Sequence, residues 1–174
     1  MTMTNPTHTA WDDAGQLEVL SFSIGEERLA VEAMMIREIL DMLPQTRVPG
    51  AAPLVDSVVN FRGKIIPIAD LRIAFGMPVE EATLDSRIVV IETAIDGELT
   101  TIGLYTDKVH EVATLDQGDS SEPPAVGVRW RRDYVREFVR QQDGVTILPD
   151  LDAIFSSFVS NSTSVSNTTS PSTH

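Results

Sequence analysis

The sequence predicts a mostly β fold, built from short strands with a few short helices. Runs rich in β-branched residues recur along the chain, such as RIVVIETAI at residues 87–95. The dipeptides Asp96-Gly97 and Asp143-Gly144 separate such runs in the way that two-residue hairpin turns do. The pattern Asp-Leu-x-x-x-Phe occurs at residues 70–75 and again at 150–155, each time after an apolar strand. Together these observations indicate two similar small barrels, each closed by a capped helix.

The first two strands are predicted from residue alternation and a turn. Residues 17–24 form the first strand, because every second residue from Leu20 onward is apolar. The turn that begins at Gly25 leads into a second strand at residues 28–31.

Residues 32–42 allow two interpretations. Their Ala, Met, Leu and Glu residues favour helix and would support about three turns. The alternative is a short helix at residues 32–35 followed by a strand at residues 36–41. Residues 43–53 contain three prolines and a glycine, so they are expected to form a loop.

The central stretch, residues 56–77, reads as strand, tight turn, strand and short helix. Gly63 separates two apolar runs, and glycine accepts the backbone angles that a tight turn needs. Asp70 precedes a short apolar segment and is expected to cap a helix that ends before Gly76. Arg62 stands at the hairpin tip without an acidic neighbour in the sequence, so its side chain is expected to point outward.

The second half of the chain is expected to start after an acidic connection at residues 79–85. Asp150 is expected to cap a last short helix that ends near Ser157. The strands of this half are predicted at residues 87–95, 99–105, 108–115 and 145–148, with a mobile loop at residues 116–128.

These elements predict one folded body flanked by two disordered ends. The body covers residues 16–157, in approximate halves of 16–82 and 83–157. Residues 1–15 are expected to be a disordered lead. Residues 158–174 are rich in Ser, Thr and Asn and have little apolar surface to bury, so they are expected to be a disordered tail.

The composition excludes several classes of protein. The 174 residues include no cysteine, so the chain has neither disulfides nor thiolate chemistry. No apolar run approaches the roughly 18 residues of a membrane span, and the N-terminus lacks the apolar region of a secretory signal. The formal net charge of −13 opposes a chain that wraps nucleic acid. We therefore expect a cytoplasmic protein without direct membrane insertion.

The sequence lacks the patterns that catalysis, metal binding or cofactor binding require. The histidines are His8, His110 and His174, and two of them lie in the expected disordered ends. No serine stands in a Gly-x-Ser-x-Gly elbow, and no Gly-rich loop is followed by Lys-Ser or Lys-Thr. No pair of histidines has metal-ligand spacing. We expect a protein that is not an enzyme and that has no catalytic residues, no cofactor and no metal.

The segment Arg129–Arg140 is the one basic stretch. It holds five of the thirteen Lys and Arg residues, interleaved with Trp130, Tyr134 and Phe138. This pattern is typical of a β-barrel module that binds oligonucleotides by stacking and phosphate contacts. The same residues also fit a helix with aromatic side chains four positions apart. The net charge and the local acids favour the prediction that this segment does not bind nucleic acid.

Two motifs stand close together in the central stretch: Asn60-Phe61-Arg62-Gly63, and then Ile66-Pro67-Ile68-Ala69-Asp70-Leu71-Arg72. They resemble the N-x-R-G and P-v-x-D-L-R core of the CheW family of chemotaxis coupling proteins. The resemblance covers about residues 17–156. Further segments that agree in order and spacing are Phe22–Gly25, Ile36–Ile39, Gly103–Val109, and Asp143-Gly144 with Ile147–Leu151.

The resemblance implies a fold of two small SH3-like β-barrel subdomains packed together, with short helices. It implies that residues 36–41 and 134–142 are strands rather than helices. The implied function is a non-catalytic adaptor that couples the cytoplasmic tips of methyl-accepting chemoreceptors to a CheA-like histidine kinase. The alternatives are the same role in a non-motility chemosensory pathway, and the oligonucleotide-binding module described above.

The resemblance also implies where partners bind. Glu38 and Arg62 match positions on the partner-binding surface of the family, and arginine suits an interface because it offers a planar fork of donors. Ser57 stands where the family usually has Gly, and Glu137 and Pro149 are further departures. The expected partner-binding residues are Ile36, Glu38, Ser57, Asn60, Arg62 and Gly63.

Overall fold

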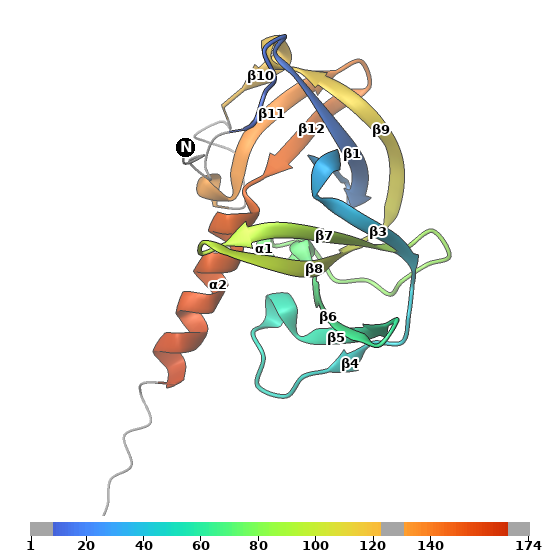
Figure 1. The fold of residues 1–174 in the computed structure, drawn as a ribbon, viewed down its shortest axis with the longest axis vertical. Helices are drawn as coiled ribbons and strands as arrows, with labels where there is room; N and C mark the ends of the chain where they lie inside the picture. The colour runs from blue at the N-terminus through green and yellow to red at the C-terminus, as the bar shows by residue number, and fades with distance from the viewer. Residues whose placement is uncertain (1–8, 123–130, 167–174) are drawn as a thin grey trace, which may run out of the picture.

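The computed structural model describes residues 9–122 and 131–166, with side chains described as far as residue 158. These residues form two six-stranded sheets that pack against each other, with a long helix beside them (Figure 1). The first sheet has the strand order β10-β11-β12-β2-β1-β9 and the second the order β3-β7-β8-β6-β5-β4. The prediction of a mostly β fold with two packed subdomains is therefore confirmed.

The strands of the first sheet are β1 (Gln16–Ile24), β2 (Glu27–Glu32), β9 (Lys108–Asp116), β10 (Ser120–Ser121), β11 (Val135–Gln141) and β12 (Gly144–Pro149). Those of the second sheet are β3 (Ile36–Asp41), β4 (Thr46–Arg47), β5 (Ser57–Phe61), β6 (Lys64–Ala69), β7 (Arg87–Ile95) and β8 (Glu98–Thr106). The α-helices are α1 (Leu71–Ala74) and α2 (Leu151–Ser166). Short 3-10 turns are η1 (Ala33–Met35), η2 (Pro53–Val55), η3 (Gln117–Asp119) and η4 (Arg132–Tyr134).

Each sheet must curl into a barrel, because short connections join its two edges. Strands β3 and β4 lie at opposite edges of the second sheet, yet only residues 42–45 separate them. Six strands in a flat sheet would span about 24 Å, whereas five peptide steps reach about 17 Å at most. The first sheet has the same constraint, since the three residues of η3 join its edge strands β9 and β10. We call the first sheet barrel A and the second barrel B.

The predicted halves, residues 16–82 and 83–157, do not correspond to the two barrels. Barrel A contains β1 and β2 together with β9–β12, whereas barrel B contains β3–β8. The chain leaves barrel A through η1 after β2 and returns only after β8, so barrel B is inserted into barrel A. The acidic connection at residues 79–85 therefore joins α1 to β7 inside barrel B rather than separating two halves.

Three apolar clusters hold the fold together. Leu17, Val19 and Val139 belong to the interior of barrel A, and Val59, Ile68 and Val90 to the interior of barrel B. The largest cluster lies between the barrels and takes residues from both, together with α1 and α2. Its fully buried members include Phe22, Ile24, Leu29, Leu71, Val89, Ile91, Leu104 and Ile154.

Tertiary packing decides the two ambiguous segments. Residues 33–41 form η1 and then strand β3, because Leu40 enters the barrel B interior while Ile36 packs against the core between the barrels. Strand β11 pairs with β12, with Phe138 opposite Ile147, so the helical interpretation of the basic segment is wrong. The strands that the resemblance implied at both places are confirmed.

Both ends of the folded body extend further than expected. Residues 9–15 pack on barrel A: the Trp11 side chain contacts its interior cluster, and Asp12 Oδ1 accepts hydrogen bonds from the Ala14 and Gln16 amides at 2.9 and 2.8 Å. Helix α2 continues to Ser166 instead of ending near Ser157, and neither Gly nor Pro interrupts it. The start of the expected loop at residues 116–128 forms η3 and β10, while residues 1–8, 123–130 and 167–174 lie outside the described residues.

Close packing at Gly103 gives a test of the barrel B interior. A Cβ atom there would lie 2.6 Å from Ile68 Cδ1 and 2.7 Å from Ile88 Cγ2. We expect Gly103→Ala to lower the free energy of unfolding by about 1–3 kcal/mol, because the core must shift to admit a methyl group. Gly118→Ala is the control, since a Cβ there meets nothing within 4 Å. Chemical denaturation that gave the two variants the same stability would contradict this packing.

Candidate functional site

The tip of the β5–β6 hairpin presents Arg62 to solvent. The two strands pair from Ser57 opposite Ile68 to Phe61 opposite Lys64, so Arg62 and Gly63 form a two-residue turn. Both have positive φ angles, 50° at Arg62 and 76° at Gly63. Positive φ at both positions is the geometry of a type I′ turn, which suits the right-handed twist of the strands. The Arg62 side chain is 73% exposed, in agreement with the expectation that it points outward.

Barrel closure brings Glu38 to Arg62. Glu38 lies on β3, and its Oε1 is 3.7 Å from Arg62 Nη2. The Arg62 guanidinium also lies over the Phe61 ring, 4.6 Å from the ring centroid. An exposed ion pair of this kind contributes about 0–1 kcal/mol to stability. The sequence placed no acid beside Arg62, and the fold supplies one from a strand more than twenty positions earlier.

The other predicted residues divide into two groups. Gly63 and Asn60 lie with Arg62 at the exposed end of the hairpin. Ser57 lies at the far end of β5, where its Oγ donates to Asp56 Oδ1 at 3.0 Å. Ile36 is half-buried against the core between the barrels, and a β-bulge separates it from Glu38 in the pairing with β7. The structure therefore gathers Glu38, Asn60, Arg62 and Gly63, while Ile36 and Ser57 stand apart.

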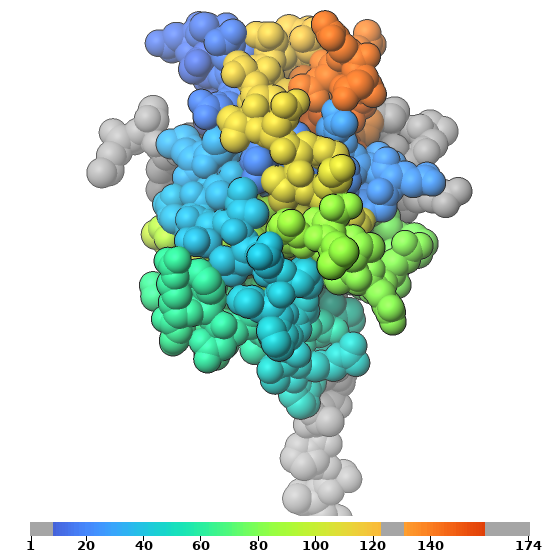
Figure 2. Space-filling model, turned by 90° about the vertical axis from the view of Figure 1, so that its right-hand side faces the viewer, coloured from blue at the N-terminus to red at the C-terminus, as the bar shows by residue number. Residues whose placement is uncertain are grey.

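An exposed apolar residue next to this cluster was missed by the sequence analysis. Ile65 is 63% exposed and pairs with Asn60. Ile39 is 45% exposed, but it follows Glu38 on β3 and therefore lies on the opposite face of that strand. Figure 2 shows the light-blue segment that contains β3 lying directly beside the green segment that contains the hairpin. Arginine and exposed apolar side chains together are typical of protein interfaces. The exposure of Ile65 could have been predicted from the sequence. Ile65 and Ile66 are neighbours on β6, so they lie on opposite faces of the strand and only one of them can face the interior of the barrel.

The basic segment does not form a stacking surface in the part that the structure describes. Tyr134 is buried, and Phe138 packs against the core between the barrels. Arg131 pairs with Asp133 at 2.9 Å and Arg132 with Glu122 at 3.5 Å. Arg129 and Trp130 lie outside the described residues. The geometry of residues 131–140 therefore gives the oligonucleotide-binding alternative no aromatic platform.

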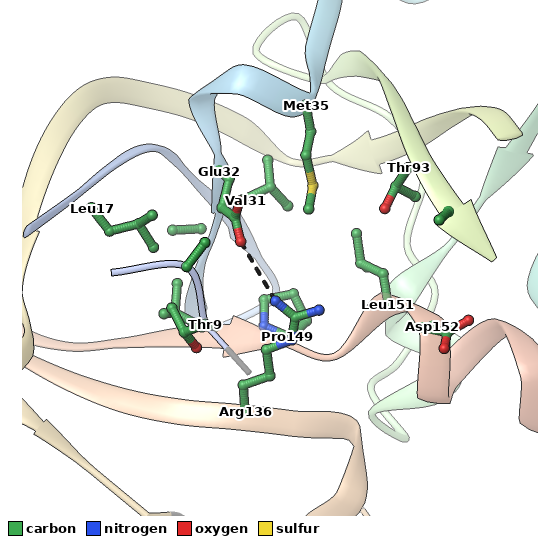
Figure 3. A pocket seen from close by; sticks show the side chains of 14 residues that line it. Thr9, Leu17, Val31, Glu32, Met35, Thr93, Arg136, Pro149, Leu151 and Asp152 are labelled. Carbon is green, nitrogen blue, oxygen red and sulfur yellow. Dashed lines mark hydrogen bonds and ion pairs between the residues drawn. The ribbon is translucent and has the colours of Figure 1, made fainter. Parts of the chain in front are cut away.

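A cavity of about 320 Å³ lies where barrel A, strand β7 of barrel B, η1, α2 and residues 9–10 meet (Figure 3). An ion pair between Glu32 Oε1 and Arg136 Nη1, at 3.5 Å, lies at its wall, and both side chains are 14% exposed. Met35 and Leu151 point into the same space (Figure 3). Arg136, a member of the basic segment, is thus part of an interior ion pair rather than of a phosphate-binding surface.

One serine and one histidine come together on the surface of barrel A. Ser23 Oγ and His110 Nε2 are 2.6 Å apart, on the neighbouring strands β1 and β9. Burial, with the charges of Arg28 and Lys108, lowers the pKa of His110. Because the pair is exposed and lies outside the cavity, we interpret it as a link between strands rather than as an enclosed active site.

The sequence motif Asp-Leu-Arg at residues 70–72 builds a buried ionic cluster that the sequence analysis did not predict. Asp70 caps α1 by accepting from the Arg72 amide at 3.1 Å, and its carboxylate also binds the Arg72 guanidinium at 2.9 and 2.8 Å. Arg72 is 5% exposed and lies over the Tyr105 ring, 4.1 Å from its centroid. Burial opposes the charge of Arg72, but the hydrogen bonds and charge of Asp70 raise its pKa. The sequence feature that could have predicted this ionic cluster is an arginine two positions after a capping aspartate.

The part of the chain that the structure describes offers neither a metal-binding cluster nor a membrane-spanning helix. No group of three or more His, Asp or Glu side chains among these residues could hold a metal ion. No helix within residues 9–122 and 131–166 is both long and apolar enough to cross a membrane.

The Arg72 cluster predicts a large stability effect at Asp70. We expect Asp70→Ala to lower the free energy of unfolding by about 3–5 kcal/mol, because it removes the closest carboxylate from the buried Arg72 guanidinium. Asp133→Ala is the matched control, since the Asp133–Arg131 pair is more than half exposed on both sides. Thermal or denaturant unfolding measures both variants, and an Asp70→Ala effect as small as that of the control would refute the cluster.

Comparison with known proteins places this architecture in a family. The family model described as "CheW-like domain" matches residues 18–159. The chain is 29% identical over 143 residues to a chemotaxis protein CheW of Rhizobium meliloti (strain 1021), covering 82% of this chain and 90% of that protein. It is 27% identical over 138 residues to a chemotaxis protein CheW of Bacillus subtilis (strain 168), covering 79% and 85%.

A solved structure of a CheW protein also matches this chain. The crystal structure of the scaffolding protein TtCheW from Thermoanaerobacter tengcongensis superposes with a TM-score of 0.69 at 29% sequence identity. The match covers 80% of this chain and 92% of that one. Since the family model spans most of the chain, including both barrels and the start of α2, this protein belongs to the CheW-like domain family.

Proposed function

We propose that this protein is a chemotaxis adaptor that couples the cytoplasmic tip of a methyl-accepting chemoreceptor to a CheA-like histidine kinase. The observation that carries the proposal is the match of residues 18–159 to the CheW-like domain, with relatives that are chemotaxis and scaffolding proteins. Such an adaptor works in the cytoplasm and needs no chemistry of its own. The same adaptor role in a non-motility chemosensory pathway uses the same surfaces.

The proposed partner-binding surface centres on Arg62. Arg62 is exposed, lies over Phe61 and pairs only loosely with Glu38, so its guanidinium can form new hydrogen bonds without breaking a close one. Asn60, Gly63 and the exposed Ile65 surround it with a small polar and apolar area. Ile36, at the edge of the core between the barrels, and Ser57, at the base of the hairpin, belong to the outer parts of this proposed surface.

Charge reversal at Arg62 tests the proposal. We expect Arg62→Glu to weaken association with the kinase or the receptor by about 30-fold or more, equivalent to roughly 2 kcal/mol for an interface anchor. Thermal unfolding should change little, since surface charge changes shift stability by about 0.5 kcal/mol or less. Binding is measured by co-sedimentation or titration calorimetry with the kinase and receptor fragment from the same organism.

The matched control is Arg132→Glu, which reverses an exposed arginine in barrel A that also has a single ion pair near 3.5 Å. It should bind both partners like the unaltered chain. If Arg62→Glu unfolds the protein, or if it binds as well as Arg132→Glu, the site assignment is wrong. If the unaltered chain binds neither partner, the proposed function is wrong.

A second substitution separates stability from binding at the same position. Arg62 has a φ of 50°, and Asn tolerates such left-handed angles better than Arg, above all before Gly in a type I′ turn. We expect Arg62→Asn to keep or raise the free energy of unfolding, by up to about 1 kcal/mol, while it weakens partner binding. Denaturant unfolding and the binding assay above check the two effects, and an Asn variant that loses stability would show that the Arg62 side chain is needed for folding.

A further inference from the structure

The polypeptide crosses between the two barrels at two places. The first is η1, which joins β2 of barrel A to β3 of barrel B. The second is Asp107, the single residue between the end of β8 in barrel B and the start of β9 in barrel A. Asp107 therefore lies at the junction of the barrels, where its side chain can reach groups on both.

The Asp107 side chain does contact both barrels. Its Oδ2 accepts a hydrogen bond from the Gly25 amide, in the β1–β2 turn of barrel A, at 2.6 Å. Its Oδ1 accepts from the Tyr105 hydroxyl of barrel B at 3.0 Å and lies 3.8 Å from Arg72 Nη1. The Asp107 amide adds a bond to the Ser23 carbonyl at 2.9 Å. One carboxylate thus links a turn of barrel A to the buried ionic cluster of barrel B.

On the barrel B side, further hydrogen bonds fix the groups that contact Asp107. Arg72 is fixed by Asp70 and donates from Nη1 to the Glu80 carbonyl at 3.0 Å. Burial raises the pKa of Tyr105, so its hydroxyl stays protonated and remains a donor to Asp107. On the barrel A side, the β1–β2 turn packs closely against the segment after α1, since a Cβ atom on Gly25 would lie 3.1 Å from Met77 Sδ.

A second polar link lies at the other end of β8. The tip of the β7–β8 hairpin meets α2, which follows β12 of barrel A (Figure 1). There the Asp96 amide donates to Asp152 Oδ1 at 3.0 Å, and Ser156 Oγ donates to Asp96 Oδ1 at 2.9 Å. The Asp107 link therefore joins the base of this hairpin to a turn of barrel A, and the Asp96 link joins its tip to α2, the helix that follows β12 of barrel A.

These two links add directional contacts to the apolar core between the barrels. The hydrophobic effect is itself non-directional, and the core restricts the orientation of the barrels only through the packing of its side chains. Hydrogen bonds to a carboxylate are short and directional, and two of them at opposite ends of one hairpin fix an angle.

We propose that Asp107 is a positioning residue which, with the Asp96–Asp152 link, sets the angle between the barrels and so allows the adaptor to hold two partners at once. The part about partners rests on the function proposed above. The Asp107 carboxylate lies beside Arg72, which follows the end of β6, whereas Arg62 precedes the start of that strand. Its loss should therefore spare binding of a single partner and impair joint assembly.

Distance measurements between the barrels test the first part directly. The chain has no cysteine, so Val145→Cys in barrel A and Leu99→Cys in barrel B, both at exposed positions, accept spin labels at those two sites alone. The unaltered background should give one narrow distance distribution by pulsed electron paramagnetic resonance. Asp107→Ala should broaden or shift it. Asp12→Ala, which removes a carboxylate that accepts two backbone amides within barrel A, should not.

Binding measurements test the second part. Asp107→Ala should bind the kinase alone and the receptor fragment alone within about twofold of the unaltered chain, and should weaken joint assembly by about fivefold or more, the lower end of coupling between two sites. If Asp107→Ala does not fold, Asp107→Asn serves instead, because its amide oxygen keeps one acceptor while the charge is lost.

The outcomes separate this inference from the proposed function. An unchanged distance distribution in the folded Asp107 variant overturns the inference, and so does unchanged joint assembly. If the unaltered chain binds neither partner, the proposed function fails together with the part about partners, while the distance measurement still decides whether Asp107 sets the angle between the barrels. Equal loss of single-partner binding and joint assembly would assign Asp107 to a partner surface and also overturn the inference.

Discussion

The apolar core between the two barrels is the contact on which the rest of the structure depends. It takes Phe22 and Leu29 from barrel A, Val89 and Leu104 from barrel B, and adds Ile154 from α2. Each barrel alone has only a small interior, so much of the apolar surface is buried where the barrels meet. Barrel B forms from the continuous segment β3–β8, whereas barrel A needs strands from both sides of that segment and therefore cannot form from one continuous half of the sequence.

The two barrels have the same arrangement of secondary-structure elements. In each, a hairpin is followed by a capped helix, and the second strand of that hairpin pairs in parallel with a strand of another hairpin: β6 with β8, and β12 with β2. The capping residues also match, since the amides of Asp70 and Asp150 donate to the carbonyls of the buried Leu54 and Tyr134 at 2.9 and 2.8 Å. The repeated Asp-Leu-x-x-x-Phe motif in the sequence corresponds to this repeated structure.

The position of Arg62 follows from this arrangement, because Arg62 lies in the turn of the β5–β6 hairpin. A hairpin tip at the rim of a barrel has its strands fixed by the interior, here by Val59 and Ile66, while the turn itself contacts little. The turn can therefore hold an arginine at a φ of 50°, where Asn or Gly would be less strained. A residue that is locally unfavourable, exposed and weakly paired fits a role in binding better than a role in folding.

The contrast with Arg72 shows how burial separates two arginines only ten positions apart. Arg62 is 73% exposed, and its nearest carboxylate is 3.7 Å away. Arg72 is 5% exposed and makes two short bonds to Asp70. The first is accessible to solvent, whereas the second lies at the junction from which Asp107 reaches Gly25.

The sequence by itself determined the local elements of this protein, because turns and caps depend on short-range chemistry. Asp96-Gly97, Arg62-Gly63 and the Asp70 cap could be predicted from a few neighbouring residues, and the family motifs added the strand at residues 36–41. Only the tertiary structure decided how the strands are shared between barrels, because pairing of β2 with β12 and of β6 with β8 joins residues far apart in the chain. The same long-range closure placed Glu38 beside Arg62 and Asp107 beside Gly25, which no local pattern in the sequence could have shown.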